Sequence, residues 1–279
     1  MNASNILFPP SGRPRGAPRP SPTFQELIIT GDGGARFRLL AANDRATRER
    51  AYRLAWRVYE RSGYVPHGGA GLLTSPFDAH ERTLTLLIED EAQRDIGTVT
   101  LINDSIHGLP VDELYLEELY PLRLGGRRLV EVSRLAVDDE QPHSQSLALR
   151  LVYLVHMFAL HAQGGTDIVI EINPRHVSFY RRLMRFEMAG EERACPYVQG
   201  APAVLLRLDM QKIEAQRREP SSPALARTVY GRFTAMDEDT AAVKAVAARR
   251  APMSADDAMY FGVGASSFAP AFQAGTDHR

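Results

Sequence analysis

The stretch RLVEVSRLAVD, residues 128–138, determines how the rest of the chain is interpreted. Its β-branched and apolar residues predict a strand, which three polar residues interrupt: Glu131, Ser133 and Arg134. Residues 145–161 follow with a pattern that is apolar almost all round, which predicts a central helix. Residues 167–172 then predict a strand buried on both faces. A strand, a crossover helix and a second buried strand together indicate a parallel pair.

The segments around this unit extend the sheet. Residues 84–88 and 96–102 are two apolar runs with a polar turn between them, which predicts an antiparallel hairpin. Asp44 is placed to cap a helix whose large apolar residues recur at helical spacing. The further elements that we expect are strands at 36–41 and 203–209 and helices at 45–61, 110–120 and 177–185. The fold class is therefore α/β (α+β), with a mixed sheet between helices.

Outside the core the residue composition differs. Prolines run through residues 1–23, which contain few large apolar groups, so we expect a disordered tail. Residues 24–216 are expected to form one domain. Residues 217–279 are expected to form a linker, short helices and a loose tail, with Ser254 capping one helix together with Asp257.

The composition excludes several classes of protein. The 279 residues include 33 basic and 34 acidic side chains, so no positive excess favours nucleic acid or an anionic membrane surface. The single cysteine, Cys195, excludes an internal disulfide and a CxxC zinc site and suits a reducing bacterial cytoplasm. No metal-binding spacing occurs. No apolar run reaches the roughly 20 residues of a membrane span, and peripheral membrane contact for product release is left open.

Glu131 is the most informative residue, because an ionised carboxylate inside a central strand is costly unless it is paired. One interpretation is a structural ion pair with Arg134 that braces the sheet. The other is a functional site, where buried carboxylates are common. Strict alternation places Glu131 and Arg134 on opposite faces, whereas a β-bulge between them would place both charges on one side.

A second informative segment runs from Ile172 to Phe186. The buried strand ends at Asn173, and Pro174 begins a short helix that carries Tyr180. Tyr180 is expected to face the end of the strand. The alternative is that it is simply a core aromatic residue.

The order of Asn173, Tyr180 and Phe186 resembles the closing strand–helix–strand of the GNAT acyltransferases. More closely, residues 36–210 resemble the bacterial N-acyl amino acid synthases, which are relatives of the acyl-homoserine-lactone synthases. The resemblance is carried by the Glu131-Val132-Ser133-Arg134-Leu135-Ala136-Val137 core and by weaker pieces such as Phe77-Asp78 and Gly97-Thr98-Val99. It implies a GNAT-like sheet of about six or seven strands flanked by helices.

The resemblance implies transfer of a long-chain acyl group from a thioester to the amine of an amino acid. Glu131 would be the general base, Arg134 would orient Glu131 or hold the acceptor carboxylate, and Tyr180 would protonate the departing thiolate. A backbone N–H of residues 135–137 would stabilise the oxyanion. The substrate-binding candidates are Trp56, Arg57, Asp78, Ser133, Leu135, Ala136, Val137 and Asn173.

Two departures bear on the acyl donor. Thr100 stands where these families often carry an arginine, which leaves open any acyl-phosphopantetheine or carrier contact assigned to that arginine and motivates the alternative of a non-catalytic module. Residues 138–146 contain three acids and no glycine, so they suit the diphosphate of coenzyme A poorly. We therefore expect acyl-phosphopantetheine on acyl-carrier protein as co-substrate, with no tightly bound cofactor. A coenzyme A-dependent GNAT acetyltransferase and a non-catalytic acyl- or carrier-binding module stay open.

The helix at 45–61 is rich in arginine and is a candidate surface for an acidic carrier protein. The alternative is an ordinary solvated face whose charges are balanced by nearby carboxylates.

Overall fold

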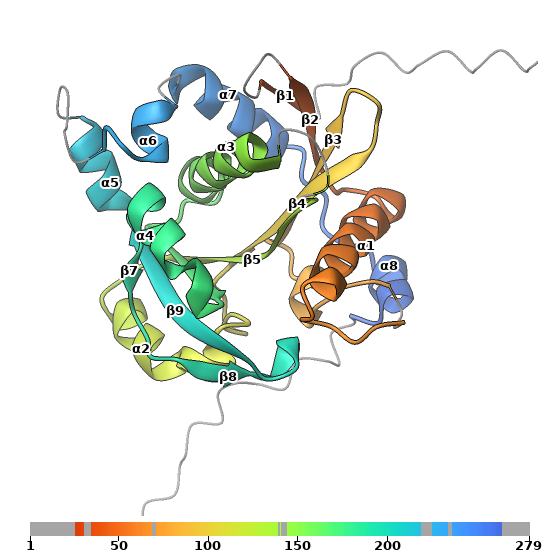
Figure 1. Ribbon diagram of the computed structural model, residues 1–279, viewed down its shortest axis with the longest axis horizontal. Coiled ribbons are helices and arrows are strands. Elements are labelled where there is room, and N and C mark those ends of the chain that lie inside the picture. The colour runs from red at the N-terminus through yellow and green to blue at the C-terminus, as the bar shows by residue number, and fades with distance from the viewer. Residues whose placement is uncertain are drawn as a thin grey trace, which may run out of the picture.

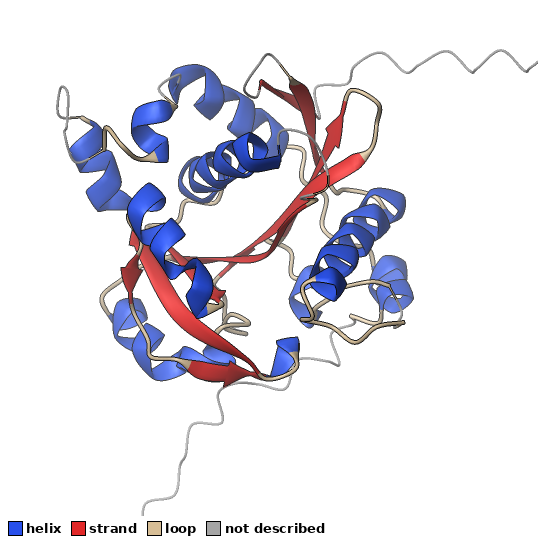
Figure 2. Ribbon diagram, viewed as in Figure 1, coloured by secondary structure: helices blue, strands red, loops and turns tan. Residues whose placement is uncertain are grey.

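A computed structural model describes residues 26–30, 35–68, 71–138, 140, 144–218, 225–233 and 236–263. The expected tail at residues 1–23 lies outside these ranges. Nine strands form the sheet, in the order β1-β2-β3-β4-β5-β6-β9-β7, with β8 paired to β9 (Figures 1 and 2). Their bounds are β1 Glu26–Thr30, β2 Arg36–Ala41, β3 Leu84–Asp90, β4 Asp95–Asn103, β5 Leu129–Val137, β6 Asp167–Ile172, β7 Glu187–Met188, β8 Arg193–Cys195 and β9 Ala201–Asp209.

The predicted mixed sheet is confirmed, but the strand number was too low. The short strands β1, β7 and β8 were not expected. β7 and β8 have two and three residues, too few to show an alternating pattern in the sequence. The predicted hairpin is β3 and β4, which pair antiparallel. β5 and β6 are the predicted parallel pair, joined by the crossover helix α3 (Ser144–Met157), which ends in a short π-helical turn, η3 (Phe158–Ala162).

Helices cover both faces of the sheet. Figure 1 shows the sheet close to edge-on, with α1 (Arg45–Arg61) and α2 (Asp112–Leu124) on one side and α3 on the other. Leu54 of α1 packs on Leu87, and Tyr115 of α2 packs on Val169. On the opposite face, Leu151 of α3 belongs to the largest core cluster. Asp44 caps α1 as predicted, accepting a hydrogen bond from the backbone N–H of Thr47 at 2.8 Å.

The segment after β9 forms four helices: α5 (Met210–Arg217), α6 (Val229–Arg232), α7 (Met236–Ala247) and α8 (Ala255–Phe261). Ser254 caps α8 as expected. α7 adds Val243 and Val246 to the core cluster beside α3. α8 packs on α1, where the rings of Tyr52 and Phe261 meet edge to face at 5.2 Å. The domain boundary at residues 216 and 217 stays a prediction, and helices beyond it pack on the sheet domain. Within the part of the chain that is described, no helix is long and apolar enough to cross a bilayer.

Candidate active site

Glu131 lies in the middle of β5 with only 4% of its surface exposed. Its Oε2 accepts a hydrogen bond from the backbone N–H of Val111 at 2.9 Å. Burial raises the pKa of Glu131 to about 8, the Val111 N–H opposes this rise, and the negative charge of Glu171 adds to it. No cation in the described part of the chain forms an ion pair with this carboxyl. A buried carboxyl with this pKa can accept or donate a proton near neutral pH.

The interpretation of Glu131 and Arg134 as a structural ion pair does not hold, because Arg134 pairs with Asp78 instead. Its Nη1 donates to Asp78 Oδ2 at 2.8 Å and to the carbonyl of Leu73 at 3.0 Å, and its Nη2 contacts Asp78 Oδ1. Asp78 lies in the 3₁₀ turn η2 (Pro76–Ala79) and also accepts a hydrogen bond from the backbone N–H of Ser75. Both partners are buried, so the pair anchors the 72–79 loop to β5.

A β-bulge directs Arg134 to the side of the sheet where Glu131 lies. The register between β4 and β5 shifts between Thr98 and Thr100, and Arg134 has a φ of 52°. The left-handed backbone at Arg134 breaks the alternation, so that Arg134 reaches Asp78 and the ring of Tyr52 on the α1 side. The bulge therefore places both charges on one face, and only the pairing of the charges differs from the sequence-based expectation.

A gap between β5 and β6 begins at Glu131. The two strands pair in parallel only from Leu129 to Glu131, and the last pair is Glu131 with Val169. From Val132 onward the β6 side of β5 has no strand partner among the described residues. Backbone N–H groups along this part of β5 are therefore available to a bound molecule.

Tyr180 lies across the gap on α4 (Val177–Met184). It is half-buried, and its ring meets those of Phe179 and Phe186 edge to face at 5.3 and 5.7 Å. Burial raises the pKa of Tyr180, so the phenol keeps its proton at neutral pH. Tyr180 is thus both a partner in an aromatic cluster and a potential proton donor.

A model of the N-acyl amino acid synthases, described as "N-acyl amino acid synthase FeeM", matches residues 50–209. The chain belongs to the FeeM N-acyl amino acid synthase family. It is therefore an acyltransferase, and the GNAT-like architecture expected from the sequence is confirmed. The match begins within α1, ends with β9, and includes Asp78, Glu131, Arg134 and Tyr180.

The solved structure of FeeM, an N-acyl amino acid synthase from uncultured soil microbes, is 26% identical. The superposition covers 73% of this chain and 100% of that one, with a TM-score of 0.58. The acyl-homoserine-lactone synthase LasI is 18% identical, covering 63% and 91% of the two chains at a TM-score of 0.48. BjaI, a coenzyme A-dependent acyl-homoserine lactone synthase, is 20% identical. The superposition covers 70% of this chain and 87% of that one, with a TM-score of 0.47. No curated protein matches the chain by sequence.

The other candidate residues of this family member differ in their exposure and in their contacts. Arg57 is exposed and lies 3.6 Å from Asp138, and Asn173 accepts a hydrogen bond from the backbone N–H of Arg175 as the cap of the turn η4 (Pro174–His176). Trp56 is half-buried on α1. Ser133 pairs with Thr100 across the β4–β5 ladder. Leu135, Ala136 and Val137 form the end of β5 along the gap. Their roles toward substrate stay predictions.

Thr100, at the position of the expected arginine, is buried and contacts Thr85. Its hydroxyl lies 3.1 Å from that of Thr85, and both side chains are buried beneath α1. The position thus holds two hydroxyls that hydrogen-bond to each other, and Arg134 is a buried guanidinium on the same side of the sheet.

The arginines of α1 are neutralised, which favours the solvated-face alternative. Most of their carboxylate partners come from remote parts of the chain, and Glu49 lies on α1 itself. The ion pairs are Arg48 with Asp257, Arg50 with Glu89 and Asp95, Arg53 with Glu49, and Arg57 and Arg61 with Asp138. Little net positive charge is left on α1 for an acidic partner.

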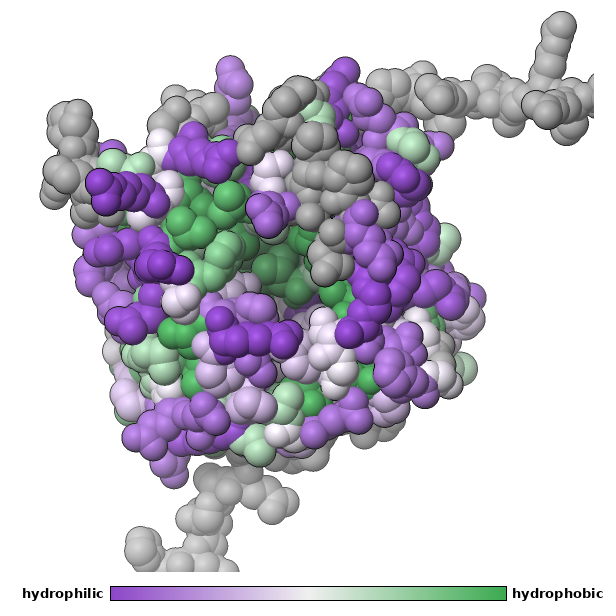
Figure 3. All heavy atoms as spheres, viewed as in Figure 1, coloured by the Kyte–Doolittle hydropathy of each residue, from purple (hydrophilic) through white to green (hydrophobic). Residues whose placement is uncertain are grey.

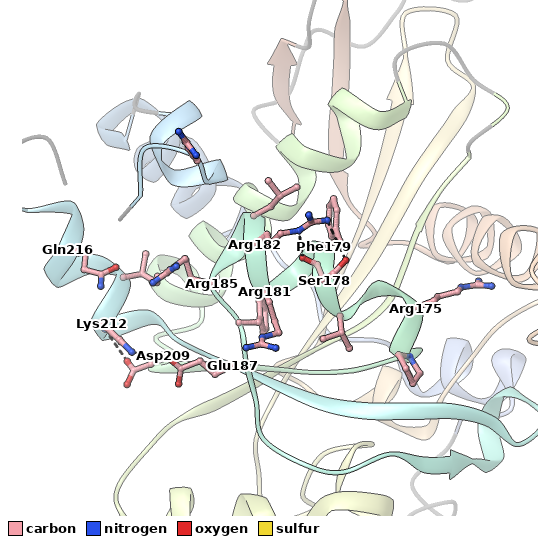
Figure 4. A pocket seen from close by; sticks show the side chains of 16 residues that line it. Arg175, Ser178, Phe179, Arg181, Arg182, Arg185, Glu187, Asp209, Lys212 and Gln216 are labelled. Atoms are coloured by element: carbon pink, nitrogen blue, oxygen red, sulfur yellow. Dashed lines mark hydrogen bonds and ion pairs between the residues drawn. The ribbon is translucent and has the colours of Figure 1, made fainter. Parts of the chain in front are cut away.

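A different basic surface surrounds α4, and sequence reasoning did not find it. A cavity of about 990 Å³ lies along α4 and α5 (Figure 4). Its cationic lining residues are Arg175, Arg181, Arg182, Arg185, Lys212 and Arg227. The acids in the lining, Glu187 and Asp209, already pair with Lys212 and with Arg127. Arg181 and Arg185 are exposed and make no ion pair with any described residue. The sequence does indicate this basic surface, because residues 175–185 contain four arginines and no acid.

Glu171 on β6 was also missed. It is a second carboxyl, after Asp167, in a strand whose other residues are apolar, which is the same kind of signal that singled out Glu131.

Proposed function

We propose that this protein transfers a long-chain fatty acyl group from acyl-carrier protein to the amine of an amino acid. The observation that carries the proposal is the carboxyl of Glu131, buried without a cation partner at the start of the gap between β5 and β6. Family membership supplies the reaction class, acyl transfer. Acyl-carrier protein and free amino acids occur together in the bacterial cytoplasm, where we place the reaction.

Glu131 is proposed as the general base. The amine of an amino acid is an ammonium ion at neutral pH and cannot attack a thioester until it loses a proton. Glu131 takes that proton, the nitrogen forms a bond to the thioester carbon, and the C–S bond breaks. Tyr180, whose phenol stays protonated, is proposed to give a proton to the departing thiolate. The nitrogen loses its second proton to solvent as the amide forms, and the Tyr180 phenol regains a proton from solvent.

The transition state needs donors for the carbonyl oxygen. Beyond Glu131 the backbone of β5 is unpaired on its β6 side, so an N–H among residues 135–137 is the proposed oxyanion donor. A separate donor is available for the acceptor, because the Nε–H of Arg134 is buried and has no hydrogen-bond partner among the described residues. That N–H is proposed to bind the acceptor carboxylate, while Asp78 holds the rest of the guanidinium in place.

An acyl chain fits the α3 side of the gap. Half-buried apolar residues adjoin the core cluster there: Val132, Leu135 and Val137 on β5, Ile172 on β6 and Val177 on α4. Figure 3 shows hydrophobic residues at the bottom of a hollow beside α3 and over β4 and β5. Burying an alkyl chain away from water contributes about 0.8 kcal/mol of binding free energy for each CH₂ group. Burial in this hollow therefore favours donors with long acyl chains.

Two features favour a carrier protein as the donor. The segment after β5 has no glycine, and its acids Asp138 and Glu140 neutralise Arg57 and Arg61, so it offers little positive charge to the diphosphate of coenzyme A. The arginines of α4 instead provide a broad positive surface that matches the acidic surface of a carrier protein. Acyl-coenzyme A is the competing donor, because its phosphates are also anionic.

The reaction is tested with purified protein, each of the twenty common amino acids, and palmitoyl-carrier protein or palmitoyl-coenzyme A. Mass spectrometry should detect an N-palmitoyl amino acid formed faster from the carrier protein. Faster turnover of the coenzyme A thioester would overturn the donor assignment. Absence of any N-acyl amino acid from both donors would overturn the function.

The basic surface on α4 gives a direct prediction. Arg181→Glu combined with Arg185→Glu should raise the KM for acyl-carrier protein about tenfold or more, because the docking charges are reversed. Turnover of a short acyl-pantetheine thioester should not change. The matched control is Arg53→Glu on α1, where the arginine is already paired with Glu49. Equal effects of the two changes on the KM for acyl-carrier protein would contradict docking at α4.

A further inference from the structure

Glu171 lies close to Glu131 on the neighbouring strand. Val169 faces Glu131 in the last parallel pair, and Glu171 is two residues further along β6. Residues two apart on a strand share a face, so the two carboxyls project to the same side of the sheet. Leu205, opposite Glu171 on β9, belongs to the cluster beneath α2. Both carboxyls therefore lie on the α2 side, at the start of the gap between β5 and β6.

No cation in the described part of the chain neutralises Glu171. It forms no ion pair with the described residues, and its hydrogen-bond partner is the buried thiol of Cys195 on β8. A thiol is a weak donor and offsets little of the cost of burying a carboxylate. Burial raises the pKa of Glu171, and the charge of Glu113 on α2 adds to the rise. A partly buried carboxylate without a cationic partner is energetically unfavourable in the free protein and favours binding of a positive group.

We propose that Glu171 binds the ammonium group of the acceptor beside Glu131 and thereby selects an amine as the nucleophile. The inference rests on the proposed function and adds a substrate-binding residue to it. The ammonium would lie between the two carboxyls on the α2 side, opposite the α3 side where the acyl chain is placed. Glu131 then removes one proton and the nitrogen attacks the thioester, while Glu171 stays ionised and holds the remaining N–H groups.

Binding of the ammonium also explains how Glu131 can act as a base at neutral pH. A positive charge next to a carboxyl lowers its pKa, so the acceptor itself would ionise Glu131. The negative charge of Glu171 acts in the opposite direction in the free enzyme. The other titratable groups near Glu171 are Tyr59 on α1, Glu113 and Tyr115 on α2, Cys195 on β8 and Tyr197 in the turn η5 (Pro196–Val198).

The test is Glu171→Gln, assayed with palmitoyl-carrier protein and the amino acid that the wild-type protein acylates fastest. The KM for the amino acid should rise about tenfold or more, because a charge-assisted contact is lost. The KM for palmitoyl-carrier protein should not change. The acid limb of kcat/KM should move to lower pH, because Glu131 no longer has a negative neighbour. Glu117→Gln, at an exposed position of α2, is the matched control and should change none of these values.

An unchanged KM for the amino acid together with an unchanged pH profile in Glu171→Gln would overturn the inference and leave the proposed function intact. If the wild-type protein acylates no amino acid, the proposed function fails and the inference fails with it. If Glu171→Gln does not fold, Glu171→Asp provides the same test. Aspartate keeps the negative charge, but its carboxylate lies one methylene group further from the ammonium. The variant should therefore raise the KM for the amino acid without moving the acid limb of the pH profile of kcat/KM. An unchanged KM in Glu171→Asp would then count against the inference.

Discussion

Replacing Glu131 with glutamine is expected to lower the turnover number roughly a hundredfold or more while the chain stays folded. Glutamine has nearly the same shape and can still accept the hydrogen bond from Val111, but it cannot take a proton. Steady-state rates with acyl-carrier protein and the acceptor amino acid measure the effect. Glu117→Gln serves again as the matched control. If Glu131→Gln kept more than about a tenth of the wild-type rate, Glu131 would not be the base.

The same variant has a predictable effect on stability. The pKa of Glu131 is raised to about 8 in the folded chain, so folding favours the neutral carboxyl. The stability that this group contributes is therefore fully present below its unfolded pKa of about 4.3 and is lost as pH rises through about 8. Glu131→Gln should match the wild type in urea unfolding at pH 4 and be the more stable protein at pH 8. A variant less stable than the wild type at pH 8 would contradict the assigned environment of Glu131.

Replacing Asp78 with alanine is expected to destabilise the chain by about 3–5 kcal/mol and to abolish acyl transfer. The change leaves the guanidinium of Arg134 buried without its carboxylate and removes the acceptor for the Ser75 N–H. Urea unfolding and steady-state rates measure the two effects. Glu187→Ala is the control for an exposed ion pair, with Lys212, and should cost no more than about 1 kcal/mol.

A double variant separates stability from activity at this site. Asp78→Leu with Arg134→Met replaces both charges with apolar side chains, which is often neutral for stability when a buried pair is removed together. The double variant should recover most of the stability lost in Asp78→Ala and stay inactive, because the Arg134 Nε–H is gone. Recovery of activity in the double variant would show that Arg134 does not contact the substrate.

Local sequence patterns were sufficient for most of the fold. The strands at residues 36–41 and 167–172 and the helix at 45–61 have the predicted bounds, because apolar periodicity and the Asp44 cap act over a few residues. The hairpin of β3 and β4 and the crossover through α3 followed from the order of these elements. β7 and β8 were missed because strands this short form only where β9 already offers an edge.

The sequence by itself determined that Glu131 is a buried carboxyl on a central strand, since no surface strand would be so apolar around it. The tertiary structure alone decided which charges pair. Asp78 is 56 residues from Arg134, and the bulge that joins them depends on the register between β4 and β5. The arginines of α1 look available in the sequence and are neutralised, whereas those of α4 keep their charge. Coulomb energy depends on distance in space, so the pattern of charges along a chain cannot specify the partner of each one.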